Sequence, residues 1–210
     1  TTNAKWGKGQ YMVAEADESD GSFLYLNPKI VLVTNIEDDH LDYYGSQEKL
    51  NEAFVRFINN TPEDGAAVLC MDNPALVQLL PRLTNKRRLT YGTSPGVWLR
   101  GDNIRCERGL MKAEVYCEDQ LLGTVQLKVP GRHNILNALG AIAVGLECGL
   151  EFSQMAKILE DFSGAHRRFE WIGMAGGIRI FDDYAHHPTE IKATIDAARL
   201  LNPGRIIVVF

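Results

Sequence analysis

The chain has 210 residues and a formal net charge of −5, and 45% of its residues are hydrophobic, which is enough for one well-packed core. Lys and Arg form no basic block and no apolar run is long enough to cross a bilayer, so neither a nucleic-acid partner nor membrane insertion is predicted. The first ten residues lack the apolar core of a signal peptide, which favours a cytoplasmic protein. The four cysteines have neither CxxC nor zinc-finger spacing, and we predict buried free thiols.

The first half of the chain alternates predicted strands and helices. Residues 11–15 and 30–34 are short, continuous apolar runs, which is typical of strands buried on both faces. Residues 46–59 carry apolar side chains at helical spacing, with Ser46 as N-cap. Residues 66–71 form another apolar strand, and Pro74 then opens a short helix. This order predicts an α/β fold with a mostly parallel central sheet and flanking helices.

The next part of the chain, residues 88–129, contains strand patterns with no helix between them. Turn residues separate four runs, at residues 88–91, 97–100, 110–117 and 121–129. We predict that they form an antiparallel β-meander packed at one side of the parallel sheet.

Two helices are predicted after the meander. The first has an apolar stripe between residues 135 and 146, and Gly149 is suited to end it. The second covers residues 153–161.

The pattern then starts afresh. Residues 169–174 and 178–181 read as strands joined by an Ala-Gly-Gly turn, Pro188 starts a helix, and residues 205–210 resemble a buried strand. We therefore place a domain boundary near residue 166, with a central domain at 1–165 and an incomplete second, Rossmann-like α/β domain at 166–210. Because the chain stops inside an apolar strand, we expect it to be part of a longer protein.

Two acidic clusters directly follow predicted strands, where open α/β sheets bind ligands. The first is Glu15-Ala-Asp-Glu-Ser-Asp20, whose carboxylates could hold Mg²⁺ or form a solvated turn. The second runs from Asn35 to Asp42 and surrounds His40 with carboxylates. Its imidazole could be fixed in one tautomer or share a metal, or the segment could be only a polar helix start.

A third cluster, Phe181-Asp-Asp-Tyr-Ala-His-His-Pro188, lies between a predicted strand and a helix. Its carboxylate, aromatic and imidazole groups suit a nucleotide, although the histidines could instead cap the helix.

Two smaller signals accompany these clusters. His133, Asn134 and Asn137 open the long helix and could read an adenine edge, unless Asn134 is simply its N-cap. The run from His166 to Arg168 lies at the proposed domain boundary. An arginine there could reach a phosphate or form only a surface salt bridge.

Five segments in this order resemble the Mur ligase family over nearly the whole chain. They are Glu15–Asp20, Thr34-Asn-Ile-Glu with Asp39-His-Leu-Asp42, Pro130-Gly-Arg-His-Asn134 with Asn137-Ala138, Arg167-Arg-Phe169, and Asp182-Asp-Tyr-Ala-His-His-Pro188. Each segment alone is weak evidence for this resemblance, whereas all five in the family's order are specific to the family. The variants resemble the branch that adds L-alanine to UDP-N-acetylmuramate, with the tripeptide-recycling branch as the nearest rival.

The resemblance implies an ADP-forming ligase of peptidoglycan synthesis that uses ATP and Mg²⁺ and activates a carboxylate as an acyl phosphate. It implies that Glu15 and His40 bind Mg²⁺ and that His40 and Arg168 serve catalysis. Asn134 and Asn137 would lie at the adenine, His133 beside them would also bind the cofactor, and Arg168 would approach the γ-phosphate. Asp183, Tyr184 and His186 would hold the ribose and phosphate side of ATP.

Two departures from the family pattern matter. The Gly-rich phosphate loop ending in Gly-Lys-Thr is absent, and we expect it upstream of Thr1. Residues 54–57 also contain no lysine where several members carry a carbamylated one, which favours the alanine-adding branch. We therefore expect that the isolated chain does not catalyse ligation. Folylpolyglutamate synthase and a non-catalytic nucleotide-binding domain remain alternative hypotheses.

Overall fold

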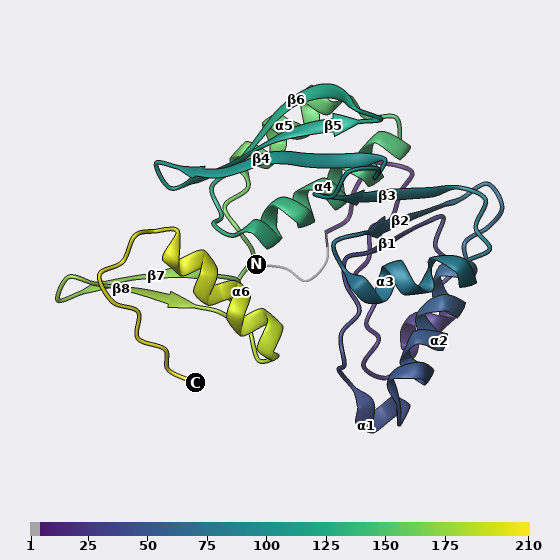
Figure 1. The fold of residues 1–210 in the computed structure, drawn as a ribbon, viewed down its shortest axis with the longest axis horizontal. Coiled ribbons are helices and arrows are strands. Elements are labelled where there is room, and N and C mark those ends of the chain that lie inside the picture. The colour runs from purple at the N-terminus through teal and green to yellow at the C-terminus, as the bar shows by residue number, and fades with distance from the viewer. Residues whose placement is uncertain (1–4) are drawn as a thin grey trace.

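The computed structural model describes residues 5–210, and its main element is a six-stranded sheet with the strand order β1-β2-β3-β4-β5-β6 (Figure 1). A second sheet contains only β7 and β8. The strands are β1 (Ile30–Val33), β2 (Ala66–Cys70), β3 (Arg88–Gly92), β4 (Leu99–Glu107), β5 (Leu110–Cys117), β6 (Gln120–Leu127), β7 (Glu170–Ala175) and β8 (Ile178–Asp182). The helices are α1 (Leu41–Tyr44), α2 (Gln47–Asn59), α3 (Pro74–Leu79), α4 (Arg132–Glu147), α5 (Phe152–Asp161) and α6 (Pro188–Arg199), with short 3₁₀ turns at Ser22–Tyr25 and Leu80–Arg82. The predicted α/β class is confirmed.

The parallel part of the sheet lies at the centre of the core. Every residue of β2 is buried, because α2 and α3 cross over on one face while α4 lies against the other (Figure 1). The α2 helix starts as predicted: the hydroxyl of Ser46 accepts a hydrogen bond from the backbone of Lys49. Asn73 caps α3 in the same way, with Pro74 in the first turn.

The predicted meander is only partly correct. The β3 strand runs parallel to both β2 and β4, and within the six-stranded sheet only β4, β5 and β6 pair in antiparallel fashion. These strands also continue the parallel sheet rather than packing beside it. A short loop can join β3 to parallel β4 because the two strands are paired only at Tyr91 with Leu99 and Gly92 with Arg100.

The long α4 helix packs closely on the sheet. A Cβ on Gly140 would lie only 3.0 Å from the Tyr91 hydroxyl oxygen, so glycine at this position permits the close approach. The helix ends at Cys148, and the following Gly149 adopts a φ of 79° while its N–H donates to the Leu146 carbonyl. This confirms the predicted stop at Gly149.

The last part of the chain forms a hairpin and a helix. The antiparallel pair β7 and β8 turns at Gly176 and Gly177, both with positive φ, and α6 begins at Pro188 as predicted. Figure 1 shows α6 beside the first turns of α4. There the buried Ala197 approaches the backbone of Gly131.

Two predicted strands are wrong. Residues 11–15 and 205–210 are not in strands, and Met12, Val13 and Val209 are 88%, 95% and 94% exposed. An apolar run becomes a strand only when a neighbouring strand satisfies its backbone groups. No strand among residues 5–210 pairs with either run, and β1 is therefore an edge strand.

The four cysteines are free thiols, as predicted, but only Cys70 is buried; the other three are half-buried. Within residues 5–210, no helix has the length and apolar content required to cross a membrane.

Candidate functional site

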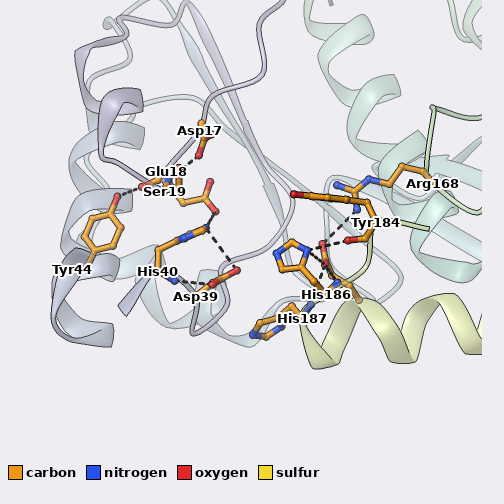
Figure 2. A network of polar contacts seen from close by, with 11 residues as sticks. Asp17, Glu18, Ser19, Asp39, His40, Tyr44, Arg168, Tyr184, His186 and His187 are labelled. Carbon is orange, nitrogen blue, oxygen red and sulfur yellow. Dashed lines mark hydrogen bonds and ion pairs between the residues drawn. The ribbon is translucent and has the colours of Figure 1, made fainter. Parts of the chain in front are cut away.

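The first two acidic clusters lie against each other (Figure 2). The hydroxyl of the buried Tyr44 donates to the Glu18 carbonyl, 2.5 Å away. The His40 imidazole Nε2 lies 3.9 Å from a carboxylate oxygen of Glu18 and 3.7 Å from one of Asp39. His40 itself adopts a left-handed backbone with φ 55° at the start of α1, a costly conformation for a residue with a side chain. Both segments are thus held in one arrangement.

The acidic turn at residues 17–22 has its own hydrogen bonds. The Asp17 carboxylate accepts from the Ser19 N–H at 2.8 Å, and the Asp20 carboxylate accepts from the Ser22 N–H at 2.9 Å. Hydrogen bonds from Ser19 and Ser22 lower the pKa of Asp17 and of Asp20 respectively. Both carboxylates therefore remain ionised at neutral pH, which gives this edge of the molecule negative charge.

The chain does not bring the predicted metal ligands Glu15 and His40 into contact. Glu15 is exposed and lines a surface hollow with Asp17 and Glu18, whereas His40 lies beside Glu18 and Asp39. Within the described part of the chain, no three His, Cys, Asp or Glu side chains are grouped as a metal site. The oxygen-rich donor set nonetheless fits Mg²⁺, which commonly takes one or two protein carboxylates together with substrate phosphates.

The first turn of α4 forms the next part of the site. Its N-cap is Gly131, so Asn134 does not cap the helix and instead donates from its side-chain amide to the Pro130 carbonyl at 2.7 Å. Asn137 is exposed. Burial lowers the pKa of His133. The charge of Asp183 raises this pKa and that of Arg168 lowers it, and the net decrease favours a neutral imidazole.

The third cluster is ordered by Asp183. Its carboxylate accepts hydrogen bonds from the Phe169 N–H at 2.7 Å and the Ala185 N–H at 2.8 Å. The guanidinium carbons of Arg167 and Arg168 lie 5.0 Å and 5.9 Å from the centre of the Tyr184 ring. The segments before β7 and after β8 therefore form one local unit.

The three clusters converge although they are far apart in sequence. Thr189 in the first turn of α6 donates to the Glu37 carboxylate at 3.2 Å, which joins the third cluster to the second. The start of α4 lies near the third cluster, because Ala197 of α6 approaches Gly131, and Asp183 and Arg168 both affect the pKa of His133. Figure 2 shows Asp39 and His40 in one view with Tyr184, His186 and Arg168.

Three residues in this region were absent from the predicted set. Glu18, rather than Glu15, is the carboxylate beside His40, and Tyr44 holds the backbone at Glu18. Glu190 contacts Arg168 and His186 from α6. Its position three residues after the N-cap His187 has the spacing of a capping box, which could have identified it.

Comparison with known proteins places these features in a family. Residues 2–145 match the Mur ligase middle domain, and residues 167–210 match the Mur ligase glutamate ligase domain. UDP-N-acetylmuramate–L-alanine ligases of Desulforamulus reducens and Pelotomaculum thermopropionicum are 50% and 51% identical over 209 residues, which is 99% of this chain in each case. The chain spans about half the length of these curated relatives, 45% of each.

Solved structures are similar as well. The UDP-N-acetylmuramate–alanine ligase of Thermotoga maritima is 31% identical with a TM-score of 0.74, covering 89% of this chain and 41% of that one. The MurF ligase of Thermotoga maritima in complex with ADP is 25% identical with a TM-score of 0.68, covering 81% and 39%.

Proposed function

The chain belongs to the Mur ligase family, and from this premise we propose that it is part of an ATP-dependent ligase that joins L-alanine to the carboxylate of UDP-N-acetylmuramate in peptidoglycan synthesis. The names of relatives at about half identity support this substrate pair. The observation that carries the proposal is the convergence of three polar clusters at one place, linked by Thr189 and Glu37.

The proposed reaction has two steps. The muramate carboxylate attacks the γ-phosphorus of ATP and ADP leaves, giving an acyl phosphate. The amino group of L-alanine then attacks the acyl carbon, and phosphate leaves from the tetrahedral intermediate. Catalysis of this kind consists mainly of orienting the reactants and neutralising charge.

We assign different residues of this chain to the γ-phosphate and to the metal ion. Arg168, whose side chain is half-exposed, would approach the γ-phosphate and balance its developing charge. Glu15 and His40 would hold Mg²⁺, with Glu18 beside His40 as a further oxygen donor. The metal would neutralise phosphate charge when bound.

The remaining predicted residues would hold the nucleotide. His133, which burial keeps neutral, would lie at the adenine with Asn134 and Asn137. Asp183, Tyr184 and His186 would contact the ribose and phosphate side from the second domain. This proposal retains a central domain at 1–165, a second domain from 166 onward, and a cytoplasmic location.

The test uses the full-length protein, UDP-N-acetylmuramate, MgATP and a panel of amino acids and muropeptides. We expect ADP and phosphate release with L-alanine, loss of release on removal of Mg²⁺ with EDTA, and none from the isolated 210-residue chain. Release with the tripeptide in place of L-alanine would indicate the recycling branch instead. Nucleotide binding without turnover would indicate a non-catalytic domain, and phosphate release from the isolated chain would contradict our expectation for it.

A further inference from the structure

Glu190 occupies an unusual position in the first turn of α6. Its carboxylate accepts hydrogen bonds from the backbone N–H groups of His186 at 3.1 Å and His187 at 3.4 Å. A carboxylate at a helix N-terminus also interacts favourably with the helix dipole. Glu190 therefore fixes the backbone of the residues that connect β8 to α6.

The same carboxylate contacts two side chains of the proposed site. Its Oε1 lies 3.6 Å from the Arg168 guanidinium, and its Oε2 lies 3.6 Å from the His186 Nδ1. Among residues 5–210, Glu190 is the one carboxylate paired with Arg168. Burial raises the pKa of Glu190, but the backbone donors of His186 and His187 and the charge of Arg168 outweigh it, so the pKa is lowered and the carboxylate is ionised.

We propose that Glu190 is a positioning residue that holds Arg168 in the direction from which it meets the phosphates of ATP. The inference rests on the proposed function. Arginine has a long side chain with many rotamers, and Arg168 is half-exposed. Its pairing with Glu190, together with the Tyr184 ring 5.9 Å from its guanidinium carbon, restricts those rotamers before the nucleotide binds. The carboxylate acts through Arg168 and does not itself need to touch the nucleotide.

The experiment is a double-mutant cycle in the full-length protein. Glu190→Gln keeps an oxygen that can accept from the two backbone N–H groups but removes the charge. We expect it to raise the KM for MgATP about two- to fivefold, the effect of one exposed ion pair, with little change in the melting temperature. Glu190→Ala removes the backbone acceptor as well and should raise the KM further. In an Arg168→Ala background, Glu190→Gln should raise the KM no further.

The matched control is Glu147→Gln in the last turn of α4, which breaks a different carboxylate–arginine pair, with Arg87. It should leave the KM for MgATP unchanged. An equal rise of the KM in both Arg168 backgrounds would show that Glu190 supports only the local backbone, and an unchanged KM in Glu190→Gln would exclude the positioning role. Failure of the wild-type protein to bind MgATP would overturn the proposed function itself.

Discussion

The hydroxyl of Tyr44 is the one side-chain donor that joins α1 to the backbone of the acidic 15–20 segment, and removing it is a direct test of that arrangement. Tyr44→Phe deletes a single oxygen from a side chain that is only 9% exposed. The phenyl ring still fills its place beside Tyr43. The change therefore isolates the hydrogen bond to Glu18 from the packing of the ring.

The expected cost follows from that geometry. A hydrogen bond inside a protein contributes about 0.5 to 1.5 kcal/mol net, and a buried acceptor left without its donor costs about 1 to 3 kcal/mol. Glu18 is only half-buried, so water can partly replace the lost donor at its carbonyl. We expect Tyr44→Phe to lower the free energy of unfolding by about 1 to 1.5 kcal/mol, or roughly 2 to 6 °C in melting temperature.

Urea denaturation of the 210-residue chain measures this difference, provided that the m-value is unchanged. The control is Tyr43→Phe, because the neighbouring Tyr43 is 56% exposed and its hydroxyl donates no hydrogen bond to residues 5–210. It should change stability by less than about 0.5 kcal/mol. Equal effects of the two substitutions would refute the role that we assign to the Tyr44 hydroxyl.

Three further predictions concern other groups. Burial raises the pKa of Tyr44 to about 12, above its unfolded value of about 10. The contribution of this hydroxyl to stability is therefore complete below about pH 10 and is lost as pH rises through about 12. Ultraviolet titration of the wild type and of Tyr44→Phe measures the pKa of the hydroxyl by difference. Asp183→Ala should speed hydrogen exchange at the two amides that donate to this carboxylate about tenfold or more, whereas Asp182→Ala should not. Gly92→Ala should lower the free energy of unfolding, measured in urea, by about 1 to 3 kcal/mol more than Gly96→Ala does. A Cβ on Gly92 would lie 2.3 Å from a carboxylate oxygen of Asp72, whereas a Cβ on Gly96 would meet no atom within 4 Å.

The elements with strong local signals could be predicted from the sequence. Helix α2 follows from the spacing of its apolar residues and the Ser46 cap, and α6 follows from Pro188. The hairpin of β7 and β8 follows from its two glycines with positive φ. In each case the stabilising groups lie within a few residues of one another, so the sequence pattern contains them all.

Features that depend on distant partners could not be predicted in this way. The apolar runs at residues 11–15 and 205–210 have strand-like composition, but pairing depends on a neighbour that local sequence does not specify. The parallel direction of β3 relative to β4 is likewise set by the loop between them.

The site shows the same division. The second and third clusters lie at the ends of β1 and β8, as predicted, but within residues 5–210 the first follows no strand, and the side chain that would face His40 could not be predicted. The turn at residues 17–22 directs Glu18, and not Glu15, toward the imidazole, and this depends on hydrogen bonds made by Ser19 and Ser22. The capping-box spacing indicates that Glu190 lies at the start of α6, but its contact with Arg168 depends on how α6 packs against the segment before β7.

Helix α4 has a consequence for how the molecule unfolds. It lies across β1 to β5 and also touches α5 and α6, so it spans the junction where the sheet changes from parallel to antiparallel pairing. The α4 residues Ile135, Leu139 and Ile142 are wholly buried. Detaching the helix would therefore expose both halves of the sheet at once. We therefore expect the two halves to unfold together, and we expect the hairpin of β7 and β8, whose strands contact mainly each other, to open at a lower free energy than this core.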